Sequence, residues 1–187
     1  MDDIVRQAMR KWPNVPDCYD WLGLDARGNW FMRDARVQAL GPFPTLETPG
    51  PAAARGALLT HGKLIEFIHR NYACDESGRW FFQNGPQRVY VALEATPFIW
   101  RLQISAHGDL TAAAHTGQPA HVRHCLLDAQ GHVYLDTDLG FGLVHSQDVP
   151  LVADRVERGQ WQPEPVEAHT LPTRFGFVRH PRTALTG

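Results

Sequence analysis

The sequence predicts an α+β fold, with a mainly antiparallel β-sheet and two or three packed helices. The first reason is a turn motif, Asp-x-x-Gly-x-(Trp or Val)-(Phe or Tyr), which occurs three times, starting at Asp25, Asp75 and Asp128. The second is the alternation of apolar and polar residues after the second copy, over residues 88–94 and 98–104. Hairpins that follow one another along a chain favour an antiparallel sheet over the strand–helix alternation of a parallel one.

The turn motif has a chemical basis in its two fixed residues. An Asp at the first position of a type I turn accepts hydrogen bonds from the backbone that follows it, and a Gly three residues later takes a left-handed conformation. The result is a hairpin with a bulge, and the aromatic residues begin the return strand. The even spacing predicts a triplicated structural unit, while chance recurrence of a common hairpin remains the alternative.

Helices and further strands are predicted from periodicity and capping. Residues 2–12 carry an apolar stripe, and residues 60–72 carry a stronger one with Thr60 as the expected cap. Asp148 can cap a short helix before Gly159. Strands are also expected at residues 17–24, 30–32, 80–82, 122–127, 133–135 and 174–179.

The chain of 187 residues is long enough for one compact domain. Residues 41–57 are rich in Pro, Gly and Ala and are predicted to be a surface loop. This loop offers a possible division into sub-units at residues 1–40 and 58–187.

Composition narrows the function classes. The net charge of −2, without a basic stripe, disfavours nucleic-acid binding. No apolar run reaches the roughly 20 residues of a membrane span, and the first residues lack a signal-peptide core, so we expect a soluble cytoplasmic protein. The three cysteines, Cys18, Cys74 and Cys125, form no C-x-x-C motif and are expected as free thiols. We predict no cofactor.

Two groups of polar residues could carry chemistry. Four histidines fall between residues 107 and 124, with Cys125 next to the last, and a metal site would use His115, His121 and His124. The spacing matches no metal motif, so solvated loop histidines are the alternative. Carboxylates two or three apart, Asp136 with Asp138 and Asp17 with Asp20, could bind a cation or form a solvated turn.

Aromatic residues dominate the strands after the second turn. Rings on an exposed sheet face could bind a ligand or a partner, with polar neighbours to orient it, whereas a sheet covered on both faces would bury them. The candidate ligand-binding residues are Trp80, Phe82, Gln83, Arg88, Tyr90, Trp100 and Arg101.

Two stretches, WPNVPDCYDWLGLDARGNWFMRD and RNYACDESGRWFFQNGPQRVYVALEATPFIWRL, resemble an uncharacterised proteobacterial domain-of-unknown-function family. The likeness spans most of residues 11–135. It implies a cytosolic bacterial protein and brings no activity, cofactor or catalytic residue.

We therefore expect a non-enzymatic binding or interaction module that uses the aromatic strands and takes a protein or small-molecule ligand. One alternative is a metal-dependent or small-molecule enzyme built on the His107–Cys125 region. Another is a structural subunit of an oligomer, since a homo-oligomer is compatible with the sequence.

Overall fold

The computed structural model describes residues 1–182 and has a mixed α+β architecture, in agreement with the predicted fold class. The chain folds into two compact units. Of the described residues, 1–25, 29–94 and 176–182 form the first unit, and 26–28 and 95–175 form the second. Residues 41–57, the possible divider, lie within the first unit. Most strand pairs are antiparallel, but three are parallel: β1 with β6, β7 with β12, and β10 with β13.

The first unit is built on a six-stranded sheet in the order β3-β2-β1-β6-β5-β4. Its elements are α1 (Asp3–Lys11), β1 (Cys18–Leu24), β2 (Trp30–Met32), α2 (Ala35–Gln38), the 3-10 turn η1 (Ala52–Arg55), β3 (Ala57–Leu58), α3 (Gly62–Arg70), β4 (Tyr72–Cys74), β5 (Trp80–Asn84) and β6 (Gln87–Leu93).

Helix α3 covers one face of this sheet. The Phe67 ring packs edge-on against Phe82, with the ring centroids 5.4 Å apart. Trp30 Nε1–H donates a hydrogen bond of 3.0 Å to Nε2 of His69 on the same helix. The helix begins one residue later than expected, because His61 rather than Thr60 caps it by accepting a hydrogen bond from the Leu64 amide.

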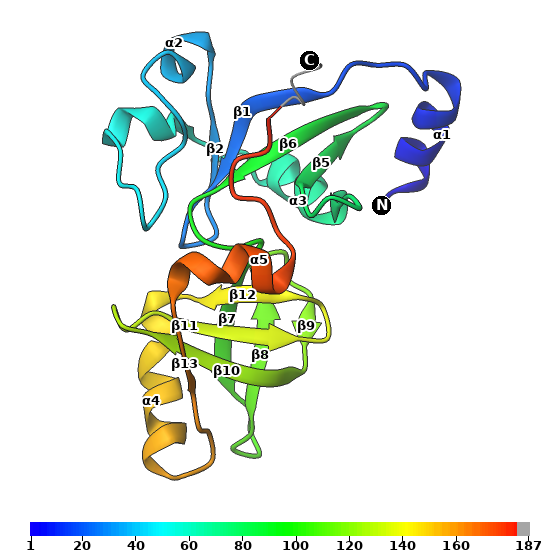
Figure 1. The fold of residues 1–187 in the computed structure, drawn as a ribbon. Coiled ribbons are helices and arrows are strands. Elements are labelled where there is room, and N and C mark those ends of the chain that lie inside the picture. Colours follow the sequence, from blue (N-terminus) through cyan, green and yellow to red (C-terminus); the bar gives the residue numbers. More distant parts are fainter. Residues whose placement is uncertain (183–187) are drawn as a thin grey trace. The chain divides into compact units, whose positions relative to one another are not determined.

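Residues 41–57 and the C-terminal segment cover the other face. The Phe43 ring is buried against Gly23, where an added Cβ would lie 2.3 Å from the ring. The Leu93 amide donates a hydrogen bond of 2.8 Å to the carbonyl of Arg179, so the C-terminal segment (red in Figure 1) runs beside β6. The expected surface loop at 41–57 is therefore partly a covering layer, because its aromatic residue enters the core.

The second unit holds a seven-stranded sheet in the order β13-β10-β11-β12-β7-β8-β9. Its elements are β7 (Phe98–Ile104), β8 (Leu110–Ala114), β9 (Pro119–Ala120), β10 (Val122–Asp128), β11 (Val133–Thr137), β12 (Phe141–Val144), η2 (Ser146–Asp148), α4 (Val149–Glu157), β13 (Glu164–Val166), η3 (Ala168–Thr170) and α5 (Leu171–Phe175). The predicted strand at 174–179 is wrong: residues up to Phe175 belong to a helix, and only an isolated bridge joins Val178 to Arg79.

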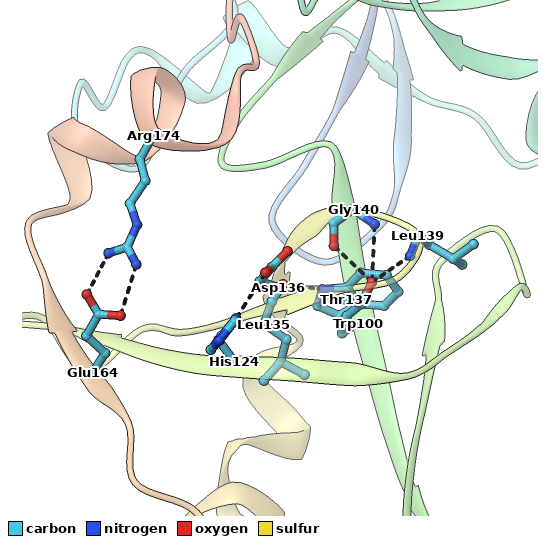
Figure 2. A network of polar contacts seen from close by, with 9 residues as sticks. All are labelled: Trp100, His124, Leu135, Asp136, Thr137, Leu139, Gly140, Glu164 and Arg174. Carbon is cyan, nitrogen blue, oxygen red and sulfur yellow. Dashed lines mark hydrogen bonds and ion pairs between the residues drawn. The ribbon is translucent and has the colours of Figure 1, made fainter.

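Trp100 is the centre of the second unit, with none of its surface exposed. Its Nε1–H donates a hydrogen bond of 3.2 Å to the carbonyl of Leu135 (Figure 2). Gly142 on β12 lies directly against it: an added Cβ would be 2.5 Å from both Trp100 Nε1 and the carbonyl oxygen of Phe98. Gly142 thus allows β12 and β7 to approach closely.

All three predicted Asp-x-x-Gly turns close hairpins, between β1 and β2, β4 and β5, and β10 and β11. Gly28, Gly78 and Gly131 have φ angles of 82°, 77° and 85°, the left-handed conformation that the motif requires. Helices precede the first two hairpins, α1 and α3, but not the third. Two further turns of the same backbone hydrogen-bonding pattern start at Ser105 and Ala114, which stand where the motif has Asp.

The turn carboxylates also hold the strands that follow. The carboxylate of Asp75 accepts hydrogen bonds from the amides of Ser77 and Arg79 and from the Tyr90 hydroxyl, and Asp128 does the same with Gln130, His132 and Tyr134. Burial raises the pKa of both carboxyls, but these hydrogen bonds outweigh it and leave the pKa below its ordinary value.

We predict that Gly142→Ala lowers the free energy of unfolding by about 2–3 kcal/mol, because the methyl group forces β12 away from Trp100. Urea unfolding followed by tryptophan fluorescence measures it. Gly62→Ala, at an open position in α3, is the control and should leave stability unchanged or raise it. Equal effects of the two variants would contradict the steric role of Gly142.

The turn carboxylates also predict how stability depends on pH. Because the pKa values of Asp75 and Asp128 are lower in the folded state than in the unfolded chain, their stabilisation is complete above about pH 4 and is lost as the pH falls towards the folded-state values. The Asp128→Asn variant should be about 1–2 kcal/mol less stable than wild type at pH 7, and the difference should shrink below pH ~4. Denaturant unfolding at several pH values checks this, with exposed Glu76→Gln as the control.

Candidate functional site

The structure places most of the aromatic candidate residues in the interior. Phe82 and Tyr90 are buried in the first unit, as Trp100 is in the second, while Trp80 is half-buried. Helix α3 packs on Phe82, and Tyr90 stacks on Tyr19, so these rings do not form an exposed surface. The candidate set is also divided between the units, because Trp100 and Arg101 belong to the second.

The polar candidates make structural contacts. Gln83 is buried and donates from Nε2 to the carbonyl of Gly85 at 2.9 Å, within its own hairpin. Arg88 lies over the Phe81 ring at 4.9 Å. Arg101 donates from Nε to the Asp148 carboxylate at 2.7 Å and thereby ties β7 to the start of α4. None of these contacts converges on a shared cavity.

The three candidate metal ligands do not come together. Within residues 1–182, no group of three or more His, Cys, Asp or Glu side chains could hold a metal ion. His115 packs against Phe98, with ring centroids 6.2 Å apart. His121 and His124 each meet a carboxylate instead of each other: the His121 amide donates to Asp138 at 2.8 Å, and His124 Nδ1 lies 3.2 Å from Asp136 Oδ2.

A hollow of about 280 Å³ lies beside this histidine region, between β10 and the start of β13. Figure 2 shows the polar pairs around it: His124 with Asp136, and Glu164 with Arg174, joined by hydrogen bonds of 2.7 and 2.9 Å. Cys125 also lines the hollow, but burial raises its pKa to about 11, so the thiol is protonated at neutral pH and is a poor nucleophile.

An apolar pocket of about 240 Å³ lies on the α3 face of the first unit. The sheet register brings its walls together: Cys18 pairs with Val89, Val89 pairs with Phe82, and Leu22 pairs with Met32. Helix α3 closes one side. The lining residues are Cys18, Trp21, Leu22, Met32, Leu59, Leu64, Ile68, Phe82, Asn84 and Val89.

The mouth of this apolar pocket leaves large apolar side chains in contact with solvent. Trp21 is 44% exposed and Met32 is 48% exposed. Helix α3 spans nine residues and does not cover the part of the sheet where these residues lie. Burial and the charge of Asp20 raise the pKa of the Cys18 thiol, the one cysteine of the pocket wall, so it stays neutral.

A second, polar pocket of about 240 Å³ is also part of the first unit. Met32 and Arg33 are consecutive, and the first lines the apolar pocket while the second lines the polar one. The polar pocket is lined by Asp20, Arg33, Gln38, Gly41, Pro42, His180 and Arg182.

Arg33 is the core of the polar pocket, with 1% of its surface exposed. Its guanidinium donates to three backbone carbonyls: to Ala54 at 2.8 Å, to Asp20 at 3.4 Å, and to Gly41 through a short hydrogen bond. Among the described residues it forms no ion pair. Burial lowers the pKa of Arg33 from its ordinary value, and nearby Asp20 partly offsets this.

Asp20 has a φ angle of 66°, and no other non-glycine residue within 1–182 has a positive φ. The β1–β6 register shifts between Cys18 and Leu22, so Asp20 occupies a β-bulge. Within the described part of the chain, its carboxylate accepts no hydrogen bond. A strained residue of this kind beside a cavity is a candidate for function.

The model of the DUF2944 family, described as "Protein of unknown function (DUF2946)", matches residues 1–182. The chain belongs to this family. This confirms the resemblance to an uncharacterised domain-of-unknown-function family, and no activity comes with it. A comparison with curated proteins finds no match.

Two crystal structures resemble this DUF2944 family chain in fold. A DUF1285 family protein from Silicibacter pomeroyi DSS-3 is 14% identical, with a TM-score of 0.50 over 82% of this chain and 84% of that one. A DUF1285 family protein from Shewanella baltica OS155 is 16% identical, with a TM-score of 0.46 over 72% of this chain and 91% of that one. At such identities the first likeness shows the fold alone.

Within residues 1–182, no helix is long and apolar enough to cross a membrane.

Neither pocket of the first unit was predicted from the sequence. Arg33 lies two residues after the first turn motif, and a signal for it existed: it is a charged residue at the end of a strand of apolar residues. The signal for Asp20 is the run Cys-Tyr-Asp-Trp-Leu, in which strict alternation fails and a bulge fits better.

We predict that Asp20→Gly raises the free energy of unfolding by about 1 kcal/mol, because glycine accepts the left-handed conformation without a steric penalty. Thermal unfolding checks this. Asp17→Gly, at an exposed position in the same segment, is the matched control and should not stabilise the protein. A loss of stability in Asp20→Gly would show that the carboxylate, and not the backbone, determines the energy at this position.

Proposed function

We propose that the first unit is a non-enzymatic binding module for a small apolar molecule, held in the apolar pocket between α3 and the sheet. The observation that supports this most strongly is the chemistry of the wall: eight of the ten lining residues are apolar, and only Cys18 and Asn84 are not. A pocket with mostly apolar walls and a few polar groups is the usual form of a small-molecule site.

The energetics favour an apolar ligand of modest size. Each Å² of apolar surface removed from water contributes about 25 cal/mol, so a ligand that buries about 150 Å² in this pocket gains about 4 kcal/mol before the entropic cost of binding. The pocket volume, about 240 Å³, is just below the range of roughly 300–1,000 Å³ for drug-sized ligands. The ligand would also cover part of the exposed Trp21 and Met32 side chains.

The enzyme alternative has less support. The hollow beside His124 contains a neutral thiol at Cys125 and no third ligand for a metal among the described residues. The cytoplasmic location, the absence of a cofactor and the possible homo-oligomer stay predictions.

We predict that N-phenyl-1-naphthylamine, an uncharged probe that fluoresces in apolar sites, binds to the wild-type protein and is displaced by octanol. Met32→Arg should weaken this binding by about tenfold or more, because a charged group at the mouth must be desolvated when the probe enters. Leu40→Arg is the matched control, since Leu40 is 52% exposed in the same unit and lies outside the pocket. Equal affinities of the two variants would contradict the proposed site.

Cys18 supplies an independent reporter of occupancy. Cys74 is exposed and would react with the same reagent, so it is replaced in a Cys74→Ser variant. This variant keeps two cysteines, Cys18 in the pocket wall and buried Cys125. Octanol should lower the rate at which a maleimide modifies Cys18, in proportion to the fraction of pockets that octanol occupies. Mass spectrometry of the peptide that contains Cys18 measures this rate. Modification at an unchanged rate under saturating octanol would place the ligand elsewhere.

A further inference from the structure

The polar pocket is a second site of the first unit, with a chemistry unlike that of the apolar pocket. Three of its side chains can carry charge at neutral pH: Arg33 and Arg182 are cations and Asp20 is an anion. Burial is the largest cause that lowers the pKa of His180, followed by the charge of Arg182. Asp20 opposes this shift, and Arg179 and Arg33 add to it, so the ring is neutral at pH 7. The wall thus presents positive and negative groups side by side.

Arg33 has capacity to bind a ligand. A guanidinium has five N–H groups, and Arg33 uses three of them on the carbonyls of Ala54, Asp20 and Gly41. These acceptors are neutral, so the buried positive charge has no carboxylate partner among the described residues. Asp20 and Gly41 both line the pocket, so their bonds fix the guanidinium at its wall. A carboxylate that accepts the two remaining N–H groups would satisfy them and neutralise the charge.

Asp20 complements this cation. Its carboxylate accepts no hydrogen bond within residues 1–182, and a backbone strain holds it at the pocket. An anionic side chain in this state has vacant acceptor positions for a cationic donor. The C-terminal segment supplies the rest of the wall, and it is fixed in place by the Leu93–Arg179 hydrogen bond and by the ion pair of 2.7 Å between Arg179 and Glu47.

We propose that this polar pocket binds a small α-amino acid as its zwitterion. Arg33 and Arg182 hold the carboxylate, and Asp20 accepts the ammonium group. The two arginines face the negative group of such a ligand, and the one aspartate faces its positive group. The amide of Gln38 and the neutral ring of His180 provide further hydrogen-bonding groups on the wall. A volume of about 240 Å³ leaves room for a small side chain. A dianionic phosphate fits less well, because Asp20 would repel it.

Three acids of nearly equal shape test the proposal: L-alanine, L-lactate and propionate, which differ only in the group on Cα. Isothermal titration calorimetry should show that alanine binds most tightly and propionate at least about tenfold more weakly, because propionate leaves the Asp20 carboxylate without its donor. Isopropylamine, which lacks the carboxylate, should also bind about tenfold more weakly than alanine.

Variants assign the two halves of the site. Asp20→Gly keeps the backbone conformation and the carbonyl that Arg33 binds, so it should reduce the affinity for alanine to that for propionate. Arg182→Ala should weaken all three acids by about tenfold. Arg36→Ala is the control, because Arg36 is an exposed arginine of α2 outside the pocket. If Asp20→Gly fails to fold, Asp20→Asn removes the charge and keeps a residue that tolerates the left-handed region.

The proposal is overturned if none of the acids binds, if propionate binds as tightly as alanine, or if inorganic phosphate alone binds. It is also overturned if alanine keeps its advantage in Asp20→Gly. The test is independent of the apolar pocket: Met32→Arg should leave the affinity for alanine unchanged, and N-phenyl-1-naphthylamine should not compete with alanine.

Discussion

The buried guanidinium of Arg33 organises the polar side of the first unit. It is bound by carbonyls from three separate segments, at Asp20 in β1, Gly41 in the following loop and Ala54 in η1. Losing the guanidinium would leave the buried carbonyl of Ala54 without its donor, at a cost of about 1–3 kcal/mol, and would also free the half-buried carbonyls of Asp20 and Gly41. Gly56 is part of the same arrangement, because an added Cβ would lie 2.2 Å from the Met32 carbonyl and 3.1 Å from the Arg33 side chain. The segment from 41 to 57 is therefore held against the sheet by backbone acceptors as much as by its apolar residues.

Local chemistry explains which parts of the fold the sequence could predict. The hairpins at Asp25, Asp75 and Asp128 form because an Asp side chain and a Gly backbone act over four residues, without help from distant parts of the chain. The same locality explains the turn that starts at Ser105, whose hydroxyl accepts from the amides of His107 and Asp109 as an Asp carboxylate would. A turn motif that allows Ser as well as Asp at its first position includes it.

Long-range pairing explains what could not be predicted. The parallel pairs β1–β6 and β7–β12 join segments separated by tens of residues, and alternation within each strand does not identify its partner. Whether an aromatic strand such as β5 is exposed or buried depends on what covers it, here α3, whose Phe67 packs on Phe82. The same holds for the candidate sites. His121 and His124 are close in sequence, yet the carboxylates that the His121 amide and the His124 ring contact, Asp138 and Asp136, come from the turn after β11 and from β11.

The bulge in β1 connects the two pockets of the first unit. In a regular strand adjacent side chains point to opposite faces, yet Trp21 and Leu22 both line the apolar pocket. The register shift between Cys18 and Leu22 makes this possible, and the left-handed Asp20 within it turns its side chain to the polar pocket. A single backbone irregularity thus gives one strand residues for both walls. A glycine at position 20 would adopt the same backbone conformation without strain, so the backbone alone does not explain why this residue is Asp. The carboxylate needs a role of its own, and binding the cationic group of a ligand would provide it.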